Sequence, residues 1–152
     1  EIISSPELRM QSLKDLVPAA ESNIKARIIL LEKGKATVEG QKKTCLALVA
    51  DETAAVHFEL WGEECDAFEG GDILSLRNGI FSYNRNNNLV LRAGKRGQVQ
   101  KVGEFSMAFV EAPNMSVIRW LPPPHSSSST AAANAYVQDA VVSPHSRIFP
   151  PI

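Results

Sequence analysis

Five short runs of β-branched, aromatic and other apolar residues, separated by turn signals, lie in the chain between residues 24 and 93. Each run has the length of a strand, and several alternate apolar with polar side chains, as strands with one buried face do. The runs span residues 24–32, 44–50, 56–61, 73–83 and 89–93. Five short strands within about 90 residues favour a small closed barrel over a two-sheet sandwich.

The connection after the third run narrows the choice of barrel. Residues 62–68 (GEECDAF) have a helical pattern, and the Gly70-Gly71 pair that follows is a loop signal. Gly79 lies inside the fourth run, where glycine often marks a bulge or a sharp bend. We therefore predict an all-β fold, a five-stranded OB-fold barrel with a short helix between strands three and four.

The third run shows which side chains face the core. Alternation along a strand places Val56, Phe58 and Leu60 on the inner face, and then His57, Glu59 and Trp61 point outward. Two interpretations of an outward tryptophan remain open. It covers the end of a small barrel, or it is a platform on which a base stacks.

A net charge of −1 hides a sharp separation of charge. Residues 51–72 hold eight carboxylates and no Lys or Arg, a pattern typical of a solvated acidic face. Residues 73–103 hold no carboxylate, two aromatic side chains and six cations: Phe81, Tyr83, Arg77, Arg85, Arg92, Lys95, Arg96 and Lys101. Two basic strands joined by the turn at 86–88 suit a polyanion whose bases stack, although an ordinary hairpin with solvated charges has the same composition.

The composition predicts one folded domain with two flanking segments. We expect an N-terminal segment over residues 1–22, the domain over residues 23–112, and a low-complexity, disordered tail over residues 113–152. Trp120 is expected to be exposed in that tail. The chain begins without Met and without a signal pattern, so we expect a fragment or a trimmed product.

Catalytic, metal-binding and membrane roles find little support in the residues. His57 is the only histidine of the presumed domain, Cys45 and Cys65 form no CxxC pair, and no glycine-rich phosphate loop is present. No apolar run is long enough to cross a membrane. We therefore expect a reduced intracellular protein that is not an enzyme and has no metal and no cofactor.

The order of several motifs resembles the DNA-binding subunit of the SOSS complex, a family of eukaryotic single-stranded DNA-binding proteins with one OB-fold. The resemblance covers roughly residues 12–116 and rests on Val49-Ala50-Asp51-Glu52-Thr53, Phe58-Glu59-Leu60-Trp61, Gly71-Asp72-Ile73-Leu74-Ser75-Leu76, Gly103-Glu104-Phe105-Ser106-Met107 and Glu111-Ala112-Pro113-Asn114. It implies single-stranded DNA binding in the DNA damage response and DNA repair in the nucleus. It also implies docking on a large helical scaffold subunit.

The resemblance also implies roles for particular residues. Trp61 matches the tryptophan on which DNA stacks in the family. The predicted nucleic-acid contacts are Trp61, Phe81, Tyr83, Arg77, Arg85, Arg92, Lys95 and Arg96. The predicted scaffold contacts are Glu104, Phe105 and Met107, and the apolar spacing continues to Phe109. The sequence departs from the family where Arg92 replaces an aromatic residue and where Ala54-Ala55 replaces a glycine.

Two other functions stay open at this point. A protein-interaction OB-fold would use the apolar residues after Gly103 and leave the basic hairpin incidental. A single-stranded RNA-binding module would use the same stacking and phosphate contacts as a DNA-binding one.

Overall fold

A computed structural model describes residues 10–121 and 137–138 of the chain. The first nine residues and residues 122–136 and 139–152 lie outside the described residues. Most of the tail predicted to be disordered is therefore outside the described part of the chain. The described elements are the 3₁₀ turn η2 Leu13–Asp15, β1 Ile24–Glu39, β2 Lys42–Ala50, β3 Ala55–Trp61, α1 Glu64–Ala67, β4 Asp72–Tyr83, β5 Leu89–Glu104, β6 Trp120–Leu121 and β7 Val137–Gln138.

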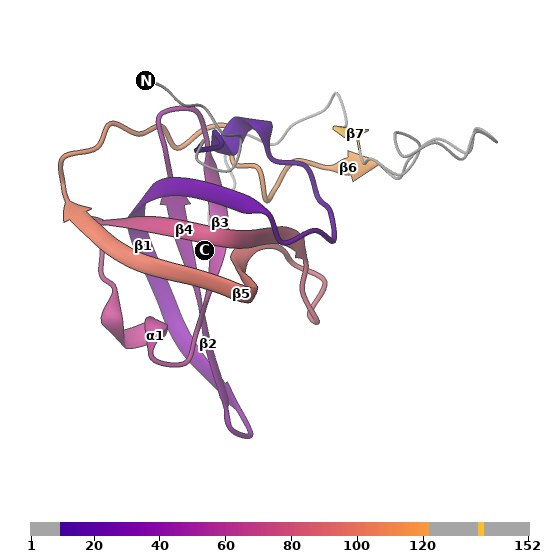
Figure 1. Ribbon diagram of the computed structural model, residues 1–152. Helices are drawn as coiled ribbons and strands as arrows, with labels where there is room; N and C mark the ends of the chain where they lie inside the picture. The colour runs from indigo at the N-terminus through magenta and orange to yellow at the C-terminus, as the bar shows by residue number, and fades with distance from the viewer. Residues whose placement is uncertain (1–9, 122–136, 139–152) are drawn as a thin grey trace, which may run out of the picture.

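The first five strands close into one barrel in the order β1-β2-β3-β5-β4 (Figure 1). The pair β3 and β5 is parallel, with Phe58 opposite Leu91, and the other neighbouring pairs are antiparallel. The one-turn helix α1 lies between β3 and β4, where residues 62–68 predicted it. This is the predicted OB-fold. Among the described residues, no helix has both the length and the apolar character needed to cross a membrane.

Two strands are longer than the sequence predicts. β1 continues through Lys33 and Gly34 to Glu39, and register shifts between Leu30 and Ala36 bend it so that it pairs with β4 at one end and with β2 at the other. β5 likewise continues from Ala93 to Glu104. Bulges explain both results, because they let a single strand curve around a barrel without ending.

The barrel interior is filled by one face of each strand. Val56, Phe58 and Leu60 are fully buried, as their alternation predicts, and they pack with buried side chains of the other four strands. Those side chains include Ile28, Leu30, Ala47, Val49, Leu74, Leu76 and Leu91.

The segments before and after the barrel also enter the core. Leu13 and Leu16 are buried, and so are Met115 and Ile118. The prediction that Trp120 is exposed is wrong: its side chain is 8% exposed. The folded unit therefore extends past the predicted limit at residue 112, because these apolar side chains cover one end of the barrel.

Contacts of the Trp120 ring explain why it is buried. The ring meets Phe81 edge to face, with centroids 6.5 Å apart and planes at 77°, and its Nε1–H donates to the carbonyl of Met115 at 3.3 Å. Trp120 also begins β6, which pairs with β7, so part of the expected tail forms regular structure.

Two carboxylates of the predicted acidic face are buried instead. Asp51 accepts hydrogen bonds from the backbone N–H groups of Leu13, Thr53 and Ala54 and from the Thr53 hydroxyl. Asp72 accepts from the Glu69 N–H. Both satisfy backbone donors at turns, which charge counting cannot distinguish from solvated carboxylates.

Candidate nucleic-acid interface

Two adjacent hollows on the outside of the barrel share Trp61 and Arg92, and together we call them the groove. The first hollow, of about 240 Å³, is lined by Glu39, Lys42, Thr44, Glu59, Trp61, Tyr83, Asn84, Arg85, Asn86 and Arg92. The second, of about 480 Å³, is lined by Ser22, Trp61, Glu64, Ile80, Arg92, Ala93, Gly94, Lys95 and Gly97. The groove thus crosses β2, β3, β5 and β4 in turn.

Two partly exposed aromatic side chains line this groove. Trp61, the last residue of β3, is 40% exposed, and Tyr83, the last residue of β4, is 41% exposed. Trp61 lies opposite Thr44 of β2 and is held at its backbone, where its N–H donates to Glu64 Oε1 at 3.0 Å. Both rings line the first hollow, so the predicted outward position of Trp61 is confirmed.

Phe81 does not belong to this surface, and its prediction as a stacking residue is wrong. Its side chain is 1% exposed and packs in the core against Trp120. A register shift between Arg77 and Gly79 causes this, because it reverses which side chains of β4 face inward. Gly79 is the sequence signal for the irregularity, but the glycine alone does not show how the faces exchange.

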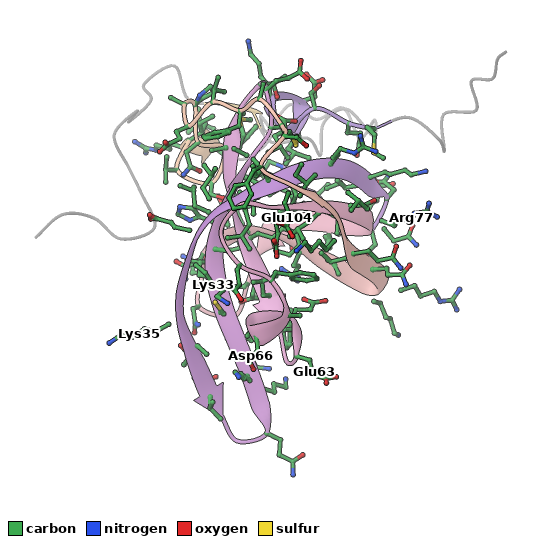
Figure 2. All side chains as sticks on the ribbon, turned by 90° about the vertical axis from the view of Figure 1, so that its left-hand side faces the viewer. Lys33, Lys35, Glu63, Asp66, Arg77 and Glu104 are labelled. Atoms are coloured by element: carbon green, nitrogen blue, oxygen red, sulfur yellow. The ribbon has the colours of Figure 1, made fainter. Side chains whose placement is uncertain are left out.

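The predicted cations divide into two groups. Arg85, Arg92 and Lys95 line the groove, whereas Arg77 and Arg96 are exposed outside its lining. Figure 2 shows Arg77 projecting from the side of the barrel opposite Lys35. The groove also contains a cation that the sequence did not indicate, since Lys42 of β2 is brought there by the barrel rather than by neighbouring motifs.

Arg92 has an unusual environment among the groove cations. The side chain is partly buried, and its Nη1 atom is buried without a hydrogen-bond partner. Buried donors are nearly always paired in folded proteins, and this nitrogen is shielded from the hollows, so an acceptor from outside the chain would reach it only if the Arg92 side chain moved.

A tight bulge in β5 forms one wall of the groove. Arg77 pairs with Gln98 and Gly79 with Ala93, so the four residues 94–97 of β5 lie opposite Asn78 alone. A Cβ atom at Gly97 would lie 2.4 Å from the Gly94 nitrogen and 2.8 Å from the Asn78 oxygen. Only glycine fits there, and the resulting Gly-Lys-Arg-Gly bulge places two exposed cations, Lys95 and Arg96, at the groove's edge.

Carboxylates lie among these cations. Glu39 and Glu59 line the first hollow and Glu64 lines the second. The Glu59 Oε2 atom accepts a hydrogen bond of 3.1 Å from Asn84 Nδ2, which fixes the carboxylate between β3 and the turn after β4. The groove is therefore mixed in charge, with a fixed carboxylate among its cations.

The predicted scaffold contacts lie on a different part of the barrel. Glu104 is exposed and pairs with Lys101, which also contacts Asp72 at 3.1 Å. Phe105 follows β5 in the left-handed region (φ 54°) and is 75% exposed, and its ring lies across Gly71. Figure 2 shows Glu104 well separated from Arg77.

Met107 differs from its neighbours in that segment. It is partly buried and packs on a second apolar cluster that includes Ile29, Leu48 and Ile73. The predicted extended stretch with Phe105, Met107 and Phe109 on one face is therefore only partly realised, since Met107 packs on the barrel while Phe105 and Phe109 are exposed.

Three titratable side chains outside the groove lining have a pKa shifted by burial. Burial lowers the pKa of His57 to about 4, and its Nε2 atom is buried without a partner. Burial raises the pKa of both free thiols, Cys45 and Cys65. Within residues 10–121 and 137–138, His, Cys, Asp and Glu side chains form no group of three that could hold a metal ion.

The comparisons with known proteins agree on the fold. No family model matches the sequence. A hypothetical protein from Arabidopsis thaliana, solved in solution, is similar with a TM-score of 0.62 and 17% identity over 83% of this chain and 97% of that chain. The replication factor A related protein from Methanobacterium thermoautotrophicum is similar with a TM-score of 0.51 and 17% identity, over 65% of this chain and 96% of that one. The chain has the OB-fold that these structures share.

Proposed function

We propose that this protein binds single-stranded DNA in the groove around Trp61 and Arg92. The observation that carries the proposal is that the exposed ring of Trp61 and the side chain of Arg92 line the same two hollows. An aromatic face accepts an unpaired base, and a guanidinium donates to phosphate or base oxygens. The similarity to a protein named as related to replication factor A also supports the proposal.

The geometry favours a single strand over a duplex as the ligand. Stacking on Trp61 and Tyr83 needs bases whose faces are uncovered, and duplex bases are covered by their neighbours. The four groove cations, Lys42, Arg85, Arg92 and Lys95, line the two hollows beside these rings and supply phosphate contacts along one strand.

We further propose, from the resemblance to the DNA-binding subunit of the SOSS complex, that DNA binding serves the damage response and repair in the nucleus. The surface around Phe105 is the proposed contact with a helical scaffold subunit. Its support is the exposed ring held over Gly71 in a left-handed turn, away from the groove. We assign the protein a binding role and no enzymatic one.

A titration with fluorescein-labelled oligo-dT, oligo-rU and a hairpin duplex, each at two salt concentrations, tests the proposal. We expect oligo-dT to bind at least tenfold more tightly than the duplex at either salt. Equal or tighter binding of oligo-rU would assign the groove to RNA instead. No measurable binding of either single strand at low salt would contradict the proposal and favour the protein-interaction alternative.

A further inference from the structure

Carboxylates are unexpected in a site that binds a polyanion, and Glu59 is the best placed of them. A carboxylate repels phosphate, so its presence in such a groove weakens binding to any backbone. Glu59 is nevertheless fixed by the hydrogen bond from Asn84 and lies in the same hollow as both exposed rings. It therefore faces the place where a stacked base would lie, and a base edge, unlike a phosphate, carries hydrogen-bond donors.

Arg92 lies beside Glu59 on the outer face of the barrel. Phe58 and Leu91 are opposite each other in the parallel pair of β3 and β5, so the residues that follow them are neighbours on these strands. The hollow is thus lined by an acceptor group, the Glu59 carboxylate, and by the neighbouring Arg92, whose guanidinium carries only donors.

The four bases differ in how well they complement this pair. Guanine carries two adjacent donors, N1–H and N2–H₂, that suit the two lone-pair directions of a carboxylate, and its O6 and N7 are the usual acceptors for arginine. Cytosine and adenine offer a carboxylate one amino group each. Thymine offers only N3–H, which lies between two carbonyl oxygens that the carboxylate repels.

We propose that the first hollow of the groove is a base-reading subsite that prefers guanine, with Glu59 as the residue that determines specificity and Arg92 as its partner. This inference rests on the proposed function, because it names which base of a single strand occupies that site. Trp61 and Tyr83 supply affinity for any base, and Glu59 converts part of that affinity into selection.

The test is a competition experiment with the full 152-residue chain and unlabelled 12-mers. One is all dT, one carries a single central dG, and one carries inosine there, which lacks the N2 amino group. A single guanine avoids quadruplex formation. We expect the dG 12-mer to compete at least about fivefold better than oligo-dT. This factor is at the lower end of the range for one bidentate pair, because only one binding register of the 12-mer places the guanine in the subsite. Inosine should recover only part of that gain.

Glu59→Gln keeps the size of the side chain and an oxygen for Asn84, and it should reduce the preference for dG to about twofold or less. Glu63→Gln is the matched control, because Glu63 is exposed outside the groove lining and projects into solvent (Figure 2). It removes the same charge and should leave the preference unchanged. If both oligonucleotides bind the wild-type chain equally, the base-reading subsite is wrong while the proposed function stands. If neither binds, both are wrong.

Discussion

Replacing Trp120 by alanine tests whether the segment after the barrel belongs to the folded unit. The side chain is 8% exposed, its ring meets Phe81 edge to face, and its N–H donates to the carbonyl of Met115. If these contacts exist, Trp120→Ala should destabilise the whole domain in one cooperative transition. If residues 113–121 formed a free tail, the substitution would have no effect on the barrel.

The expected magnitude follows from these contacts. Truncating a buried tryptophan to alanine costs about 3–5 kcal/mol. Trp120 covers an end of the barrel, where the short segment around Ile118 can partly collapse into the space. We therefore expect a value near the lower limit, about 3 kcal/mol. Trp120→Phe keeps an aromatic ring against Phe81 but loses the hydrogen bond, so it should cost about 1–1.5 kcal/mol.

The free energy of unfolding is measured by urea denaturation followed by circular dichroism, since Trp61 and Trp120 are the only tryptophans and fluorescence would mix their signals. A double-mutant cycle with Phe81→Leu should give a coupling of about 0.5–1.5 kcal/mol for the ring pair. A loss below about 1 kcal/mol for Trp120→Ala, with an unchanged midpoint, would refute this packing.

Three further outcomes follow from other parts of the structure. Gly97→Ala should lower stability by about 1–3 kcal/mol and weaken single-strand binding, because the backbone atoms around it cannot make room for the Cβ. Gly103→Ala, on the same strand, meets only ordinary contacts and should change stability and binding by no more than about 0.5 kcal/mol each. Equal effects of the two substitutions would contradict the tight bulge. His57 takes up a proton below pH 6.5 in the unfolded chain, but only near pH 4 in the folded chain, where burial lowers its pKa. The free energy of unfolding should therefore fall by up to about 3 kcal/mol as the pH is lowered from 6.5 to 4. A His57→Leu variant that loses as much stability over this pH range as the wild type would refute this. Glu104→Ala combined with Phe105→Ala should abolish capture of a helical scaffold subunit in a pull-down, and the oligo-dT affinity should stay within about twofold of the wild-type value. Retained capture would show that the docking surface lies elsewhere.

Local pattern is enough to predict the barrel and one face of the site. Strand alternation has a period of two, so the sequence assigns the inward and outward residues of β3, and Trp61 with them. The helical pattern of residues 62–68 likewise places α1. These features depend on residues close together in the chain.

The remaining features depend on contacts between distant segments. The sequence places Phe81 on the wrong face because a register shift in β4 reverses the alternation after Arg77. Trp120 lies in a sequence with the composition of a tail, and only its packing on Phe81 shows that it belongs to the core. Lys42 reaches the groove because the pairing of β3 with β5 sets the β2–β3 hairpin beside Arg92. Composition and periodicity carry no information about such pairings.

The most direct test of the central claim uses Trp61 as its own reporter. In the Trp120→Phe background Trp61 is the sole tryptophan, so quenching of its fluorescence by oligo-dT reports stacking in the groove itself. We expect strong quenching that saturates with the affinity measured by anisotropy.

In the same titration, Trp61→Ala should weaken binding by about one to two orders of magnitude. The slope of log K against log salt should stay near about −2 to −3.5, as about three to five phosphate contacts predict, and Arg85→Ala or Lys95→Ala should flatten it. Two results together would contradict the assignment of this groove as the single-strand binding site. The first is Trp61 fluorescence that stays unquenched although the chain binds oligo-dT, and the second is a Trp61→Ala variant that binds like wild type.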